Sequence, residues 1–307
     1  MPTIYSSITP MFIIIALGWA FHRKGFIPSS FIEPANRLAY YLAVPAMVFT
    51  AVSKASLTIH FDLAILVITL ICPLFVCLSA IGLARFYHLK NGELGTFIQT
   101  TYHGNLGYIG LAVSYYYLGK EGFVRASIII GFLMILQNFL SVLILSAASP
   151  QKSRHRYPWI RLKAVLGNPI IMAAMVGILF SLLQVPLPLI IDRSLDILSS
   201  LALPTALLII GATLSFDVIR HKLRLLVSAT CFKLIVLPAV AIGLFGLFDI
   251  DIHDFLPAVI LLASPTATVS YVLSREMDGD PELANGIISA STLLSAVTFS
   301  FWFLLLN

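Results

Sequence analysis

Ten apolar stretches, each close to the length that crosses a bilayer, dominate this sequence of 307 residues. A helix needs about 20 mainly apolar residues to span the hydrocarbon core, where the backbone must satisfy its own hydrogen bonds. The stretches cover residues 4–21, 35–52, 61–84, 94–118, 123–148, 164–183, 195–214, 224–248, 255–274 and 283–306. The sequence therefore predicts an all-α integral membrane protein with ten transmembrane helices.

The few charged residues predict how the chain is oriented in the membrane. Of the 19 lysines and arginines, 14 fall on one side of ten such spans, 4 fall on the other side, and Lys233 lies within a span. Because cationic residues near span ends stay in the cytoplasm, we expect the basic loop 151–163 inside the cell and both termini outside the cytoplasm. No cationic residue precedes the first stretch, so we expect it to remain as a span and not to act as a signal peptide.

Short patterns of the first half recur in the second half, in the same order and at shifts of 156 to 161 residues. The matches are Thr9-Pro10, Gly18 and Phe21 with Asn168-Pro169, Gly177 and Phe180; Leu42-Ala43-Val44-Pro45 with Leu201-Ala202-Leu203-Pro204; Ala80-Ile81-Gly82-Leu83 with Ala241-Ile242-Gly243-Leu244; and Val113-Ser114-Tyr115 with Val269-Ser270-Tyr271. Each half holds five spans, an odd number, so the second half must be inverted in the membrane. We expect repeats over residues 1–150 and 164–307, joined by the loop 151–163.

The fourth apolar stretch is interrupted where the middle of the membrane would lie. His103, Gly104, Asn105 and Gly107 stand there in place of apolar residues. Glycine costs about 1 kcal/mol relative to alanine inside a helix, and non-helical backbone at this depth must be buried in protein or line a cavity. The pattern predicts a broken helix beside a binding site, and the alternative is a glycine-rich packing face between helices.

The ninth stretch carries a matching interruption at Ser264, Pro265 and Thr266, because proline breaks the helical hydrogen-bond pattern. Ser264 and Asn105 both resemble helix N-caps, which predicts two half-helices that begin at the membrane centre. Free N–H groups at those N-termini favour an anion, whereas the C-terminal ends of the preceding half-helices favour a cation. This geometry alone leaves the sign of the substrate open.

The ionisable residues within the spans favour an anion. Lys233 and His103 lie inside spans, and no aspartate or glutamate lies near the middle of any span, although a carrier of sodium or protons normally uses such a carboxylate. For Lys233 we expect helix C-terminal carbonyls as partners; the alternatives are the carboxylate of the substrate or snorkelling to the interface. His103 fits either a binding role or a neutral buried role. Gln137 and Asn138 fit either a site lining or hydrogen bonding between helices.

These residues together resemble the auxin efflux carrier family, which includes the plant PIN auxin exporters and bacterial permeases for malonate and malate. The resemblance covers essentially the whole chain. It rests on Gly104-Asn105-Leu106-Gly107-Tyr108-Ile109-Gly110-Leu111, Asn168-Pro169, Leu203-Pro204 with Gly211-Ala212-Thr213-Leu214, Lys233-Leu234 with Pro238, and Pro265-Thr266-Ala267. Two positions depart from the family pattern: Ala112 stands where proline is frequent, and Val269 stands where asparagine is frequent.

The resemblance implies two inverted halves of five helices each, with broken fourth and ninth helices that cross beside the substrate, and a homodimer. It carries over Asn105 and Pro265 to the site, with the Gln137-Asn138 pair as a polar wall. Together with the residue patterns above, it gives the expected substrate-binding residues His103, Gly104, Asn105, Gly107, Gln137, Asn138, Ser264, Pro265 and Thr266, with Lys233 in a supporting or coupling role.

The sequence thus predicts a secondary transporter of the bacterial inner membrane. We expect it to move a small organic anion, auxin-like or a dicarboxylate weak acid, by alternating access past a scaffold of the first, second, sixth and seventh spans. No catalytic residue, metal, cofactor or nucleic-acid partner is expected. A sodium-coupled symporter of the bile-acid type is the main alternative. A channel or sensor and an intramembrane enzyme are the alternatives of other classes, and the enzyme is disfavoured because no carboxylate accompanies His103.

Overall fold

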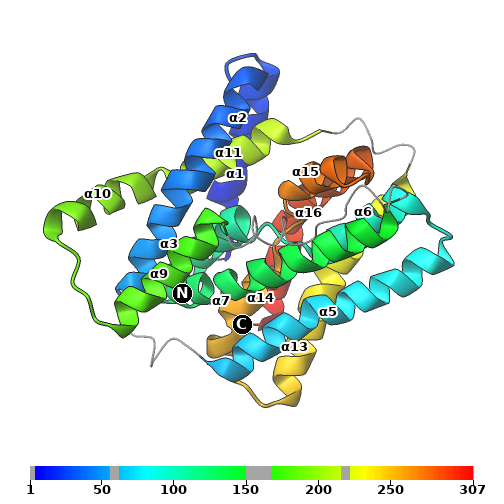
Figure 1. Ribbon diagram of the computed structural model, residues 1–307. Coiled ribbons are helices and arrows are strands. Elements are labelled where there is room, and N and C mark those ends of the chain that lie inside the picture. The colour runs from blue at the N-terminus through cyan, green and yellow to red at the C-terminus, as the bar shows by residue number, and fades with distance from the viewer. Residues whose placement is uncertain (1–3, 56–61, 150–166, 216–221, 307) are drawn as a thin grey trace. The chain divides into compact units, whose positions relative to one another are not determined.

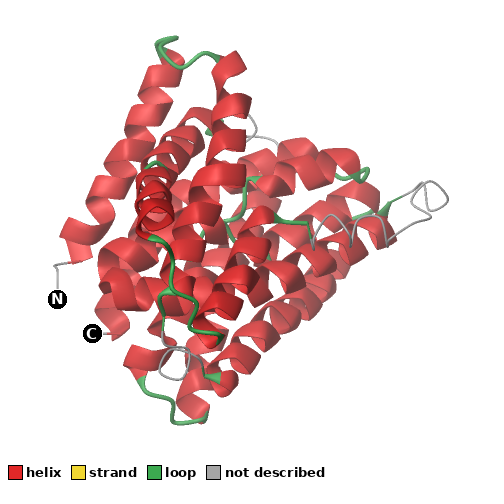
Figure 2. Ribbon diagram, turned by 60° about the vertical axis from the view of Figure 1, so that its left-hand side comes forward, coloured by secondary structure: helices red, strands yellow, loops and turns green. Residues whose placement is uncertain are grey.

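The structure is a computed structural model that describes residues 4–55, 62–149, 167–215 and 222–306 (Figure 1). Helices make up most of it, and Figure 2 shows no strand among the described residues. One isolated antiparallel bridge joins Gly104 to Thr266. The predicted all-α class is therefore confirmed for these residues, whereas the predicted loop 151–163 lies outside them.

Five helical segments within the described ranges are long and apolar enough to cross a membrane. They are Leu63–Phe86, Leu106–Ala148, Leu189–Thr213, Leu223–Leu247 and Pro281–Leu306, and shorter apolar helices cover Pro169–Leu182 and Ile252–Ala263. Each of the predicted apolar stretches is mainly helical where the structure describes it. The chain is a multi-pass membrane protein.

Two compact units make up the described chain, and each takes helices from both halves of the sequence. Unit 1 holds α1 (Ile4–Arg23), α2 (Ser29–Leu38), η1 (Ala39–Ala43), α3 (Val44–Ser53), α9 (Pro169–Leu182), α10 (Leu189–Ser200) and α11 (Ala202–Thr213). Unit 2 holds α5 (Leu63–Phe86), α6 (Asn91–Tyr102), α12 (Leu223–Cys231), η3 (Phe232–Val236), α13 (Leu237–Leu247), α14 (Ile252–Ala263), α15 (Val269–Glu276) and α16 (Pro281–Leu306). The first, second, sixth and seventh stretches thus share one unit, as expected.

The long helix α7 (Leu111–Ala148) follows η2 (Leu106–Gly110) and contributes to both units. It is continuous except at Gly119, where φ is 70° and ψ is −162°. Glycine adopts this conformation without the penalty that a Cβ would bring. Gly119 lies between the predicted stretches 94–118 and 123–148, so the two helices that meet at this kink correspond to the end of the first stretch and to the second stretch.

Within unit 1, the backbones of α1 and α11 approach each other closely (Figure 1). A Cβ atom at Gly18 would stand 2.2 Å from the carbonyl oxygen of Leu208, and one at Gly211 would stand 1.9 Å from the carbonyl oxygen of Ile15. Small residues allow such helix crossings in membrane proteins, where van der Waals packing drives association. Glycine at both positions is therefore required by this contact.

A second helix pair in unit 1, α3 with α9, also packs around a glycine. A Cβ at Gly177 would stand 3.0 Å from the Cβ of Val52, and the rings of Phe49 and Phe180 meet edge to face at 5.3 Å. Helix α9 begins after Asn168, whose Oδ1 accepts a hydrogen bond from the Ile170 N–H at 2.9 Å. Asn168-Pro169, one of the pairs on which the family resemblance rests, therefore begins the helix of the sixth predicted stretch.

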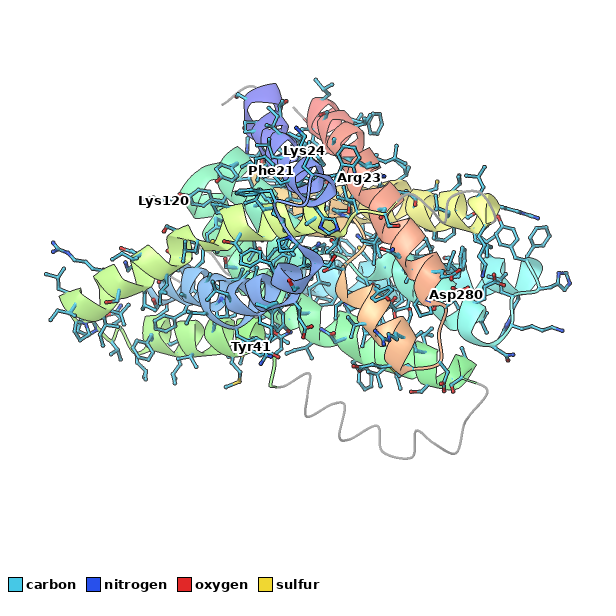
Figure 3. All side chains as sticks on the ribbon, turned by 90° about the horizontal axis from the view of Figure 1, so that it is seen from above. Phe21, Arg23, Lys24, Tyr41, Lys120 and Asp280 are labelled. Atoms are coloured by element: carbon cyan, nitrogen blue, oxygen red, sulfur yellow. The ribbon has the colours of Figure 1, made fainter. Side chains whose placement is uncertain are left out.

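Cationic residues mark the end of α1, as expected for a span that reaches the membrane surface. Arg23 and Lys24 follow Phe21 there (Figure 3). The guanidinium of Arg23 lies 5.5 Å from the centre of the Trp19 ring. Aromatic and cationic side chains are enriched together at the membrane interface, so this end of α1 has the composition of an interfacial anchor.

Helix α16 contacts α6, α12, α14, α15 and η3, and thereby holds unit 2 together. Near its C-terminal end, Trp302 is buried and its Nε1–H donates a hydrogen bond of 2.9 Å to the carbonyl of Leu234 in η3. A π-helical turn leaves carbonyl groups out of the regular α-helical pattern and is frequent at functional sites. Trp302 therefore stabilises the irregular turn that carries Lys233.

One end of unit 2 is closed by a charged cluster around Lys222. Its Nζ lies 2.9 Å from a Glu93 oxygen and is also paired with Asp280, which is labelled beside the start of α16 in Figure 3. Partial burial opposes the charge of Lys222, but the hydrogen bonds and charges of the two carboxylates prevail and raise its pKa above the ordinary value. The cluster ties α6, α12 and α16 together at the ends that we predicted to be cytoplasmic.

Candidate functional site

Both predicted helix breaks are present, and within unit 2 they pair with each other. Helix α6 ends at Tyr102 and helix α14 ends at Ala263. The N–H of Asn105 donates to the carbonyl of Pro265 at 2.7 Å, and the N–H of Ala267 donates to the carbonyl of His103 at 2.9 Å. Two non-helical segments from opposite halves of the chain thus hydrogen-bond to each other as a short antiparallel bridge.

Side chains of unit 2 satisfy backbone groups that the break at 103–105 leaves out of a helix. The Gly104 N–H donates to Oε1 of Gln137 at 3.1 Å, and Nε2 of Gln137 donates to the carbonyl of Tyr102 at 3.0 Å. Such groups must find partners where water is excluded. Gln137 is therefore a structural partner of the break. Of the two roles considered for it, site lining and hydrogen bonding between helices, the structure shows hydrogen bonding.

Thr266 is held in the same way on the other side of the bridge. Its N–H donates to Oγ of Ser291 at 3.1 Å, and its Oγ1 donates to the carbonyl of Thr100 at 3.0 Å. Both groups of Thr266 are engaged with neighbouring helices. The residue fixes the pairing of the two breaks.

Gly104 occupies a position that admits no larger residue without movement. A Cβ there would stand 2.7 Å from Oγ of Ser264 and 3.2 Å from Nζ of Lys233. The predicted site residues from three separate helical segments thus converge on a single backbone position. Absence of a side chain at residue 104 is what permits this approach.

Lys233 is fully buried, and its Nζ donates a hydrogen bond of 2.6 Å to the carbonyl of Leu262. Leu262 belongs to the last turn of α14, so its carbonyl points toward the negative end of that half-helix. The prediction that Lys233 bonds to C-terminal carbonyls at the crossing is confirmed. The lysine places a basic nitrogen beside both breaks.

The amide of Asn105 has an unused donor. The side chain is 6% exposed, and Nδ2 is buried without a hydrogen-bond partner among the described residues. A buried unpaired N–H group costs about 1–3 kcal/mol, and such exceptions in native proteins need an explanation. An acceptor atom supplied by a ligand would provide one.

The predicted N-cap at Ser264 is wrong. Ser264 ends helix α14, and its Oγ donates back to the carbonyl of Leu261 at 2.6 Å. The next helix, α15, begins only at Val269. The intervening residues stay out of a helix because Pro265 and Ala267 pair with the opposite break. Asn105, in contrast, directly precedes the helical turn η2, as expected.

The His103 ring is held at the breaks by its neighbours, whereas Asn138 and Gly107 are placed away from them. Nδ1 of His103 lies 2.8 Å from Oγ of Ser141 and 2.9 Å from Nε2 of Gln99, so the buried ring is held by its neighbours. Asn138 donates to the carbonyl of Met134 in its own helix at 2.8 Å. Gly107 lies in η2 and belongs to unit 1. Of the predicted set, the structure therefore brings together His103, Gly104, Asn105, Gln137, Ser264, Pro265, Thr266 and Lys233.

Sequence reasoning missed several polar residues that support the breaks. They are Gln99, Ser141, Ser270 and Ser291, all fully buried in unit 2. Gln99 Nε2 donates to Ser270 Oγ at 3.0 Å and so joins α6 to α15. The available signal was a glutamine four residues before His103 in an apolar stretch, which places both side chains on one face of a helix.

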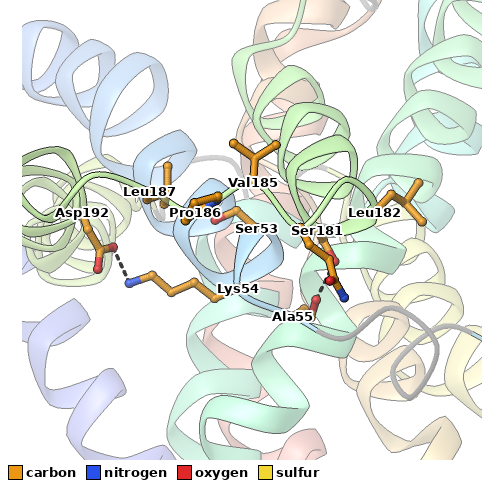
Figure 4. Close-up of a pocket in the computed structure, with 10 residues that line it drawn as sticks. Ser53, Lys54, Ala55, Ser181, Leu182, Val185, Pro186, Leu187 and Asp192 are labelled. Atoms are coloured by element: carbon orange, nitrogen blue, oxygen red, sulfur yellow. Dashed lines mark hydrogen bonds and ion pairs between the residues drawn. The ribbon is translucent and has the colours of Figure 1, made fainter.

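Unit 1 contains a separate cavity of about 510 Å³ that the sequence did not predict (Figure 4). Lys54, at the end of α3, forms an ion pair with Asp192 of α10 across it. Ser181 closes another side by donating a hydrogen bond to the carbonyl of Ala55. Because the two opposite charges satisfy each other, this cavity has no uncompensated charge for an ionic ligand.

Comparison with known proteins agrees with a transport function. A family model described as "Membrane transport protein" matches residues 3–155 and 152–303. An "Uncharacterized transporter" of Methanothermobacter thermautotrophicus is 26% identical over 299 residues, which cover 96% of each chain. A "Putative malonate transporter" of Rhizobium meliloti is 26% identical over 305 residues, which cover 97% of this chain and 94% of that protein. The chain belongs to this membrane transport protein family, the auxin efflux carrier family, and is a membrane transporter and not an enzyme.

Proposed function

We propose that the protein is a secondary transporter that binds a small organic anion at the paired breaks of unit 2 and moves it by alternating access. The observation that carries this proposal is the unpaired buried Nδ2 of Asn105, one residue from the Gly104 backbone that Lys233 approaches. A carboxylate oxygen would accept from the amide and lie near a basic nitrogen. Hydrogen bonds to charged groups are stronger than neutral ones.

The electrostatics of the breaks favour an anion over a cation. Lys233 places its nitrogen where the C-terminal carbonyls of α14 would otherwise attract a cation. The described aspartates and glutamates form no ion pair with it. In this arrangement Lys233, as an ammonium when the anion is bound, stands in the place of a coupling sodium ion, so we expect transport that does not require sodium.

The chemical class of the substrate is a small carboxylic acid, with dicarboxylates as the first candidates. The relative from Rhizobium meliloti is named for malonate. Malonate carries two carboxylates and matches one amide donor and one basic nitrogen. An auxin-like monocarboxylate is the second candidate of this class.

We further propose ten transmembrane helices arranged as two inverted repeats. Gly18 and Gly177 are 159 residues apart and match in the sequence, and each packs against a helix from the other half: Gly18 against α11 and Gly177 against α3. Matched glycines that make matched crossings support a two-fold relation between the halves. The paired breaks at 103–105 and 264–268 support it independently.

The proposed orientation places both termini outside the cytoplasm of a bacterial-type inner membrane. Two groups of charged residues support the membrane spans from which this orientation was predicted. Lys222, Glu93 and Asp280 all fall on the predicted cytoplasmic side and cluster together, and Lys54 and Asp192 fall on the opposite side and pair. On the basis of the family resemblance, we also propose that the protein forms a homodimer.

Uptake of labelled malonate into proteoliposomes tests the function, with Asn105→Ala as the diagnostic variant. Removing a buried unpaired donor leaves nothing unsatisfied, so we expect transport to be lost while the thermal unfolding midpoint stays the same or rises. Asn138→Ala is the matched control, because that amide bonds to a carbonyl of its own helix.

Unchanged malonate uptake by Asn105→Ala, or competition by organic cations and not by carboxylates, would contradict the proposed site. Uptake that stops without sodium would favour the bile-acid type of symporter, and currents above the turnover of a carrier would favour a channel.

A further inference from the structure

The buried nitrogen of Lys233 has no negative partner in the part of unit 2 that the structure describes. The side chain is 0% exposed, and its one hydrogen bond goes to a neutral carbonyl, that of Leu262. A buried ammonium without a counter-charge is strongly disfavoured. A buried lysine can therefore act as a base that holds or releases a proton.

The groups that face Lys233 do not supply the missing charge. The elements packed against η3 are α6, α12, α13, α14 and α16. Their titratable or charged side chains are Glu93, Tyr102, Arg224, Cys231, His253, Asp254 and Glu282. Most lie at helix ends, Glu93 is paired with Lys222, and the Tyr102 hydroxyl lies 3.4 Å from Ser141 Oγ. His103, directly after α6, interacts electrostatically with Lys233 but adds no negative charge.

We propose that Lys233 carries a proton that is taken up with each anion, so that transport of the anion is coupled to protons. The inference rests on the proposed function, because the bound anion supplies the counter-charge beside Gly104 and Asn105. In the empty site the amine is neutral; as the anion binds, the nitrogen lone pair accepts a proton from solvent and forms the ammonium. Anion and proton leave together when the site opens to the other side. This coupling uses an amine where such carriers normally use a carboxylate.

Isothermal titration of malonate into the purified protein at pH 8 tests the coupling. Titrations in buffers of different ionisation enthalpy give the number of protons taken up per malonate bound. We expect about one proton for the wild type, because binding changes the protonation of a single group. Lys233→Arg is the matched variant, since arginine keeps its proton at any accessible pH; it should bind malonate more weakly and take up almost no proton. Equal proton uptake by the wild type and Lys233→Arg would assign the proton to malonate and overturn the proposal.

A second measurement needs no ligand and separates this inference from the proposed substrate. If the amine is neutral in the folded protein, unfolding takes up a proton, so the stability of the wild type rises with pH relative to Lys233→Met. The difference between their unfolding midpoints should therefore grow as the pH rises toward the ordinary lysine pKa of about 10.4. A constant difference would overturn the proposal. If the difference in unfolding midpoint grows with pH but the wild type does not bind malonate, the proposed substrate class is refuted. The protonation of Lys233 is then still supported.

Discussion

At the scale of single residues, Gln137 shows how a polar side chain makes a helix break tolerable inside a membrane protein. Its amide presents an oxygen to the Gly104 N–H and an N–H to the Tyr102 carbonyl. One side chain therefore replaces two backbone hydrogen bonds that an unbroken helix would make. Asparagine at this position would be one methylene shorter and would not span both groups with the same geometry.

Gln137→Leu should lower the stability of the protein markedly. It leaves a buried N–H and a buried C=O without partners, at a cost of about 1–3 kcal/mol each. Thermal unfolding in detergent measures the loss. The neighbouring Asn138→Leu is the control and should change the midpoint little, because its amide bonds within its own helix. Equal effects of the two substitutions would show that Gln137 does not support the break.

Lys233→Gln should strongly reduce malonate transport, and Lys233→Arg should transport malonate little better than Lys233→Gln. Glutamine keeps a donor for the Leu262 carbonyl but removes the basic nitrogen, and the planar guanidinium does not fit a space shaped for a compact ammonium. Uptake into proteoliposomes with and without sodium is the measurement. Full activity of Lys233→Gln would refute the role given to this residue.

Individual residues of the breaks were predictable where they violate the pattern around them. Gly104, Asn105 and Pro265 stand out because glycine, an amide and proline are costly inside an apolar helix. Ser291 was missed because a lone serine in an apolar stretch is ordinary, and its partner, the Thr266 N–H, lies far away in the sequence. Gln99 carried a local signal in its spacing to His103, but its other partner, Ser270, lies in the second half of the chain, which no local pattern contains.

At the scale of the element, the pairing of the two breaks leaves no room for a side chain at residue 104. Gly104→Ala should therefore disturb the bridge, because its Cβ would stand 2.7 Å from Ser264 Oγ. We expect a lower unfolding midpoint and reduced transport. Gly243→Ala is the control in α13, where a Cβ meets nothing within 4 Å. That change should stabilise the helix by up to about 1 kcal/mol, and a loss of the same size in both variants would contradict this account.

The start of α15 illustrates why helix ends were harder to predict than the breaks themselves. Ser264 followed by Pro265 has the local chemistry of a helix start. The helix nevertheless begins at Val269, because the carbonyl of Pro265 and the N–H of Ala267 bond to the other break. A tertiary contact thus overrides local capping preference over four residues.

At the scale of the whole molecule, the compact units do not coincide with the sequence halves. The pattern of apolar stretches was enough to predict the helices, whereas the inverted relation between the halves that the matched motifs indicate stays a prediction. It did not predict that α7 would contribute to both units, since no residue pattern along Leu111–Ala148 marks the point at which the chain passes from one unit to the other. The assignment of residues to units depends on packing and not on composition.

The proposed orientation can be measured residue by residue. In a variant without native cysteines, a cysteine in place of Lys54 or Lys120 should react with an impermeant thiol reagent added outside intact cells. A cysteine in place of Lys24 or Lys90 should react only after the membrane is opened, because these positions fall on the side rich in lysine and arginine. The reverse labelling pattern would invert the topology and would place the Lys222 cluster outside.

The bridge between the breaks is made by main-chain groups of His103, Asn105, Pro265 and Ala267. All four residues contribute an N–H or C=O that almost any amino acid would offer equally well. The hydrogen bonds of the bridge therefore do not depend on which side chains these residues carry away from it. A substitution at Asn105 that alters the proposed contact with the anion would therefore leave the main-chain bridge in place.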